Sequence, residues 1–181
     1  MRRQLAATLA IFLTTACGTP TDQSRTQDEA SSVLPSGPEA QIDAVAAADL
    51  PAGVRDAVLG RVPGMTITGA KRKQRDGMIF YDVEGTRPDG SEVELDLLEE
   101  KGRFTVVEVQ RDIPWAEAPA PVIAAARAAP DAFEPVRVIE SKQEDGTVIY
   151  ELFAAGKSDE PAAEIDWKDG KAAVRRERAI Y

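Results

Sequence analysis

The residues of this chain that are able to do chemistry are almost all carboxylates. The sequence holds no histidine and one cysteine, Cys17, against 31 aspartate and glutamate residues. Histidine is the commonest general base, and zinc or iron–sulfur sites of the usual kind need histidine or several cysteines. The sequence also contains no phosphate-binding glycine loop and no nucleophile elbow. We therefore expect no enzyme activity, no cofactor and no metal.

The densest group of carboxylates follows one strand-like segment. Glu92, Glu94 and Asp96 alternate with apolar residues, and Glu99 and Glu100 come next. A calcium site needs several oxygens that converge, whereas these three positions of one strand are spread over about 13 Å. We therefore favour a solvated sheet face over a cation site. A glycosidase-like carboxylate pair is a further alternative, although the sequence singles out no pair.

The first 17 residues have the layout of a cleavable secretory signal. Arg2 and Arg3 precede an apolar stretch, Leu5 to Leu13, which is too short to span a bilayer, and small residues lead to Cys17. The segment resembles a bacterial lipoprotein signal, in which the cysteine carries the lipid. The alternative is an ordinary signal peptide with an incidental cysteine. The lack of aspartate at Gly18 resembles the pattern of lipoproteins sorted to the outer membrane.

Composition limits what the mature protein binds. Removing the signal leaves 20 basic against 31 acidic residues, a net charge of −11. Such a chain is not suited to nucleic acid or to anionic lipid headgroups, so the lipid alone would hold it at a membrane. We assign residues 1–16 to the signal and residues 17–43, which are rich in small and polar residues, to a flexible tether. Within it, Ile42 begins a helical spacing with Val45 and Ala46.

Residues 50–109 and 113–174 look like two copies of one small fold. Pro63, Tyr81 and Gly102 of the first copy match Pro130, Tyr150 and Gly170 of the second. Internal repetition of this kind governs the architecture of a whole chain. We take 44–111 and 112–181 as two units.

Each unit begins with a helix and continues as a meander. An apolar stripe precedes Pro63 in the first unit, and a smaller one, at Val122, Ile123, Ala126 and Ala129, precedes Pro130 in the second. Alternating strand-like runs follow, separated by Asp-Gly or Lys-Gly pairs that favour tight hairpin turns. The expected fold class is α+β, with two tandem units that each pack a helix on a three- to four-stranded antiparallel meander sheet.

The two units resemble PepSY-like domains. The resemblance is carried by Asp49-Leu50-Pro51 with its helix, by Gly77 to Glu84, by Asp89 to Leu95 and by the matching stretches of the second copy. Their tandem layout is also similar to the architecture of the β-lactamase inhibitory proteins. The resemblance implies a secreted or lipid-anchored bacterial protein, with protease inhibition proposed for PepSY-like domains, and it supplies no catalytic residue.

The aromatic residues are the candidates for contact with a partner. Tyr81, Tyr150 and Trp167 occupy strand positions, where core packing is the alternative. Trp115 lies in a proline-rich loop, where it either anchors a partner or folds back over the helix. We expect an envelope lipoprotein, palmitoylated at Cys17 and facing the periplasm, that binds a protein partner and possesses no catalytic site. Inhibition of a peptidase or other hydrolase is one form of this function. The alternative is a structural lipoprotein that serves envelope assembly or homeostasis.

Overall fold

The computed structural model of the protein describes residues 34, 39–157 and 159–179. The expected signal peptide, Cys17 and most of the expected tether lie outside these residues. Among the described residues, no helix is both long and apolar enough to cross a membrane.

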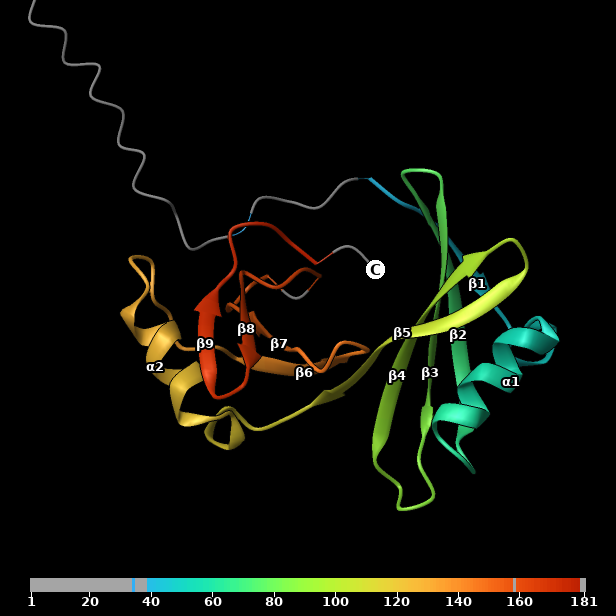
Figure 1. Cartoon of the computed structure of the whole chain (residues 1–181), viewed down its shortest axis with the longest axis horizontal. Coiled ribbons are helices and arrows are strands. Elements are labelled where there is room, and N and C mark those ends of the chain that lie inside the picture. The colour runs from blue at the N-terminus through green and yellow to red at the C-terminus, as the bar shows by residue number, and fades with distance from the viewer. Residues whose placement is uncertain (1–33, 35–38, 158, 180–181) are drawn as a thin grey trace, which may run out of the picture.

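Antiparallel strands form one sheet, in which the nine strands lie side by side in the order of the chain (Figure 1). The strands are β1 (Gln41–Val45), β2 (Thr66–Arg75), β3 (Met78–Thr86), β4 (Glu92–Glu100), β5 (Arg103–Asp112), β6 (Arg137–Gln143), β7 (Val148–Phe153), β8 (Ala163–Lys168) and β9 (Lys171–Val174). Because neighbours in the chain are neighbours in the sheet, the sheet is a meander from end to end.

The expected fold class of two separate helix-plus-sheet units is wrong, because the sheet does not stop between them. β5 pairs with β6 from Glu108–Gln143 to Asp112–Ile139. The ladder therefore continues through the point where the first unit was expected to end. Two small sheets would each leave an unpaired strand edge here, and joining them gives the backbone groups of β5 and β6 their hydrogen-bond partners.

Two helices pack on this sheet, one against β5 in its middle and the other against β8 and β9 at its end. They are α1 (Ala52–Arg61) and α2 (Ala120–Ala128), each preceded by a short 3-10 helix, at Ala47–Asp49 and Trp115–Glu117 respectively. α1 buries Val54 and Val58 in one apolar core with β4, and α2 buries Val122 and Ala126 in a second core with β7 and β8. Figure 1 shows the helices on the two outer sides of the molecule, with the curved sheet between them.

Three of the expected Gly-containing turns are confirmed as two-residue hairpin turns. Asp76-Gly77, Lys101-Gly102 and Asp169-Gly170 all have positive φ at both residues, from 51° to 78°. This is the backbone that a type I′ turn requires, and it matches the twist of the paired strands. The strands β2–β3, β4–β5 and β8–β9 are joined in this way.

The start of the folded part differs from the expectation. Residues Gln41–Val45 form strand β1, paired with Ala70–Gln74 of β2, where we expected the end of a tether and a helical turn. Most of these side chains are exposed, so apolar periodicity carried no signal and backbone pairing decides the structure. Leu34 is buried, and its N–H donates to the carbonyl oxygen of Ala162 (3.0 Å).

Candidate functional site

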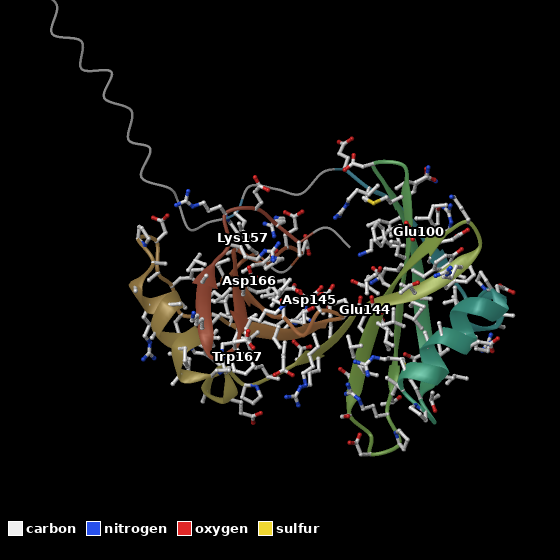
Figure 2. The ribbon with its side chains drawn as sticks, viewed as in Figure 1. Glu100, Glu144, Asp145, Lys157, Asp166 and Trp167 are labelled. Carbon is white, nitrogen blue, oxygen red and sulfur yellow. The ribbon has the colours of Figure 1, made fainter. Side chains whose placement is uncertain are left out.

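The two faces of the sheet differ in character. The helices cover the face that carries Tyr81, Val83 and Leu95, and alternate residues of each strand point to the opposite face. We call this opposite face the inner face, because it lies between the two halves of the curved sheet (Figure 2). Carboxylates from five strands lie on it, among them Asp82, Glu84, Glu94, Asp96, Glu108, Glu151, Glu164 and Asp166.

A row of polar residues crosses the inner face where the two halves meet. Asp82 of β3 lies opposite Asp96 of β4, Asp96 lies opposite Glu108 of β5, and Glu108 lies opposite Gln143 of β6. The three carboxylates are at most 5% exposed. We call these four residues the polar row.

The hydrogen bonds of the polar row come from two amides and one ammonium group. Gln143 Nε2 donates to Glu108 Oε1 (2.6 Å), and Gln110 Nε2 donates to Glu108 Oε2 (3.0 Å) and more weakly to Asp96 Oδ2 (3.4 Å). Lys73 Nζ lies 2.9 Å from Asp82 Oδ2. The row therefore has more acceptor atoms than donors.

The donor shortage leaves three buried oxygens unsatisfied. Asp82 Oδ1, Asp96 Oδ1 and Gln143 Oε1 have no hydrogen-bond partner among the described residues. A buried polar atom without a partner costs about 1–3 kcal/mol, so three in one row are a sizeable cost. Such a concentration is typical of a functional site.

Burial and mutual repulsion shift the protonation of these acids. Burial, followed by repulsion from Asp82 and Glu84, raises the pKa of Glu94 to about 6. Burial and the charge of Asp82 raise the pKa of Asp96 well above its ordinary value. Burial alone would lower the pKa of Lys73, but attraction to Asp96 and Asp82 outweighs it and raises that pKa. Lys73 therefore remains charged beside the acids.

The acidic character continues on the inner face of the second half. Burial, with repulsion from Glu108, Glu164 and Glu94, raises the pKa of Glu151 on β7 to about 8. Glu94 belongs to β4 and Glu151 to β7, so this repulsion acts between the two halves of the sheet. Carboxylates of the two halves of the inner face thus influence each other's protonation.

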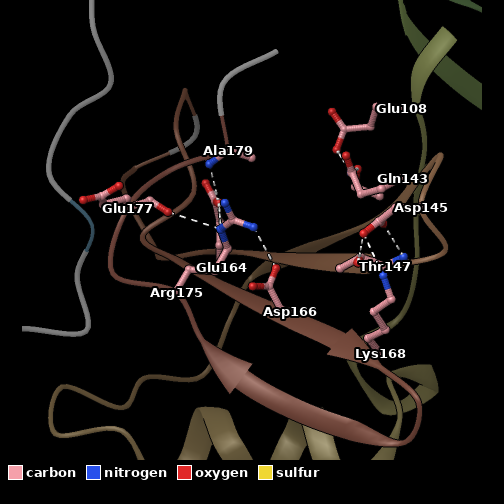
Figure 3. A network of polar contacts seen from close by, with 11 residues as sticks. Glu108, Gln143, Asp145, Thr147, Glu164, Asp166, Lys168, Arg175, Glu177 and Ala179 are labelled. Carbon is pink, nitrogen blue, oxygen red and sulfur yellow. Dashed lines mark hydrogen bonds and ion pairs between the residues drawn. The ribbon is translucent and has the colours of Figure 1, made fainter.

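The C-terminal segment lies over the inner face of β8 through Glu164 (Figure 3). Buried Glu164 accepts a hydrogen bond from the Ala179 N–H (2.9 Å) and pairs with Arg175 (3.4 Å) and Arg178 (3.8 Å). Arg175 also binds Asp166 Oδ1 (2.7 Å). Glu164 is therefore matched by two arginines.

The β6–β7 turn carries a separate, exposed network (Figure 3). Asp145 accepts hydrogen bonds from the Thr147 N–H (2.8 Å) and hydroxyl (2.9 Å), and Lys168 Nζ donates to it at 2.7 Å. These bonds, led by that of Lys168, lower the pKa of Asp145. Asp89 makes the equivalent turn contacts with Ser91 in the first half, so the two loops are structural.

A groove of about 320 Å³ opens on one end of the inner face, across the β5–β6 junction. Its charged lining residues are Glu84, Glu92, Glu94, Arg111, Asp112 and Arg137. Both arginines are already paired, Arg111 with Glu140 (2.8 Å) and Arg137 with Asp112 (2.7 Å). The free charge of the groove is therefore negative.

The aromatic residues that the sequence suggested for partner contact lie on the other face. Tyr81 is 6% and Tyr150 is 2% exposed, and each belongs to an apolar core. Trp115 and Trp167 are partly buried and pack against the second core. The structure gives all four a packing role and brings none of them into the groove.

The expectation of a solvated face is wrong for Asp96, although Glu92 is exposed as expected. The three acids of β4 do share a face, but Asp96 is buried in the polar row between Asp82 and Glu108. Sequence reasoning missed Asp82, Glu108 and Gln143, which come from three other strands. The signal in the sequence was that each of these three residues is polar at a strand position that points to the inner face.

Comparisons with known proteins give no relative. No protein-family model matches the chain, and no curated protein matches its sequence significantly.

Proposed function

We propose that the protein is a non-catalytic binding module, held at a bacterial envelope by a lipid on Cys17, and that its inner face binds a positively charged segment of a protein partner. The observation that supports this most is the acidic groove, because both of its arginines are paired with acids, whereas Glu92 and Glu94 form no ion pair with another described residue.

The position of the groove also favours binding. It spans strands of both halves, from β2 to β6, so a bound segment contacts a rigid sheet and not loops alone. Acidic surfaces speed association with cationic partners and exclude anionic ones.

The partner surface is tested by site-specific photocrosslinking in the producing cell. A photoreactive residue replaces Glu92 at the groove rim, and a matched one replaces Asp56 on the exposed side of α1. We expect a discrete protein adduct from position 92 and none from position 56. Equal adducts from both positions, or none from either, would contradict the proposal. Envelope sensitivity on deletion, without any adduct, would favour the structural lipoprotein.

The anchor is tested separately by fractionation. Cys17→Ser is expected to move the protein from the membrane fraction to the soluble fraction, since it removes the acyl chains that hold it. A variant that stays in the membrane fraction would contradict a lipid anchor on Cys17.

A further inference from the structure

We propose that the carboxylates of Asp82, Glu94 and Asp96 form a calcium site. Asp82 and Asp96 belong to the polar row, and Glu94 lies beside them on β4. Each of these residues offers a carboxylate oxygen, and the three oxygens lie within 4.8 Å of one another. This inference does not depend on the proposed protein partner.

The first argument is geometric. Calcium binds oxygen ligands at about 2.3–2.6 Å, so two oxygens on opposite sides of the ion are about 5 Å apart. The spacing of up to 4.8 Å between the three carboxylates fits this sphere. Magnesium binds at about 2.0–2.1 Å with strict octahedral geometry and usually keeps several waters and only one or two carboxylates, so three carboxylates suit calcium better. With only oxygen ligands present, a hard cation is the chemical class that fits.

The second argument comes from the oxygens that lack a partner. Asp82 Oδ1 and Asp96 Oδ1 are buried and accept no hydrogen bond from any described residue. Lys73 is bound to the other oxygen of Asp82, and Gln110 is bound to the other oxygen of Asp96. In each aspartate, one carboxylate oxygen is therefore bonded and the other has no donor. A cation could bind this second oxygen of both residues.

The third argument is charge. Asp82, Glu94, Asp96 and Glu108 bring four carboxyl groups together, and Lys73 is the ammonium group paired within them. A divalent cation between Asp82 and Asp96 neutralises both of these carboxylates at once.

The site also has a route for the ion. Glu94 is partly exposed and lines the groove, whereas Asp82 and Asp96 are buried beneath it. A cation that enters the groove reaches Glu94 first, and water from the groove supplies the remaining ligands. Glu108 is held by Gln110 and Gln143 and supports the site without touching the ion.

The test is calcium binding to the purified full chain, stripped with a chelator and titrated by calorimetry at neutral pH. The same chain is melted across a calcium series. We expect saturable binding of one ion per chain and a rising melting temperature. At a calcium concentration 100 times its Kd, the unfolding equilibrium constant should fall about 100-fold. Magnesium at the same concentration should give a smaller shift.

Two variants locate the site. Asp96→Asn and Asp82→Asn each remove a ligand charge and relieve repulsion, so both should fold without calcium and lose its stabilising effect. Glu100→Gln, on the same strand, exposed and outside the groove, is the matched control and should keep it. The absence of calcium binding to the wild-type chain would overturn the proposal. So would calcium stabilisation that survives in both aspartate variants, because the ion would then bind elsewhere. If the melting temperature does not respond to calcium but rises on acidification, protons and not calcium satisfy the buried oxygens.

Discussion

Arg137 and Asp112 form a two-bond ion pair across the junction of the two halves of the sheet. Arg137 Nε donates to Asp112 Oδ1 at 2.7 Å and its terminal nitrogen donates to Oδ2 at 3.0 Å. The guanidinium group also lies over the ring of Phe153, 5.1 Å from its centre. One side chain thus connects β5, β6 and β7 at the edge of the groove.

Arg137→Lys should weaken this junction. Lysine keeps the charge but loses the paired geometry and the stacking on Phe153. Because both partners are about half exposed, we expect a loss of only about 0.5–1 kcal/mol in the free energy of unfolding, measured by urea denaturation. Arg127→Lys, at an exposed position of α2, is the control and should change stability by less than about 0.5 kcal/mol. Equal effects would mean that the pair contributes nothing.

Gly85 permits the irregular pairing of β2 with β3. The register shifts between Ile67 and Gly69, opposite Gly85. A Cβ at Gly85 would collide with the backbone oxygen of Thr66 and approach Met65 Cε to 2.6 Å. Gly85→Ala should therefore cost about 1–3 kcal/mol in the free energy of unfolding.

Gly60→Ala is the matched control for this change. A Cβ at Gly60 meets no other atom within 4 Å, and alanine favours the helix. We expect Gly60→Ala to stabilise the protein by about 0.5–1 kcal/mol. Thermal melts of the two variants should thus move in opposite directions. A neutral Gly85→Ala would contradict the close approach of the two strands.

Stability should fall as pH rises from about 5 to about 8. In the unfolded chain the pKa of Glu151 is near 4.5, whereas in the fold burial and the charges of Glu108, Glu164 and Glu94 raise it to about 8. Between these values the folded state holds a proton that the unfolded state has lost, so the free energy of unfolding decreases with pH. The side chain is partly exposed, so we expect a loss of about 1–3 kcal/mol.

The measurement is chemical denaturation at several pH values in the presence of a chelator. Glu151→Gln removes the titrating group and should flatten the profile. Glu134→Gln, at an exposed position, should leave it unchanged. A profile in which Glu151→Gln titrates like the wild type would assign the pH dependence to other groups.

Local features of this fold were predictable from the sequence, whereas contacts between distant strands were not. The turns at Asp76-Gly77 and Asp169-Gly170 follow from residues that tolerate positive φ, and both helices follow from apolar stripes. The continuous sheet was missed because β5 and β6 are separated by α2 in the chain. Repetition of a pattern shows that two segments are alike, and says nothing about whether their edges pair.

The candidate site shows the same limit. Alternation placed Glu92, Glu94 and Asp96 correctly on one face of β4, but exposure depends on what the sheet curvature brings across that face. The polar row joins Asp82, Asp96, Glu108 and Gln143, each from a different strand. The acids of a single strand are spread along it, so the position of the polar row depends on how four strands pair with one another.

Leu34 tests where the folded part of the chain begins. It lies within the segment expected to be a tether, yet it is 5% exposed, and its backbone is bonded to Ala162 beside β8. Leu34→Ala should therefore cost about 2–3 kcal/mol in the free energy of unfolding, since it removes buried apolar surface.

Ile42→Ala, at a β1 position that is 56% exposed, is the control for Leu34→Ala and should cost less than about 0.5 kcal/mol. Urea denaturation of the two variants gives the comparison. If Leu34→Ala were as mild as Ile42→Ala, the segment around Leu34 would belong to the tether. A clear difference would instead shorten the expected tether, because the folded part of the chain would then begin at Leu34 or before it.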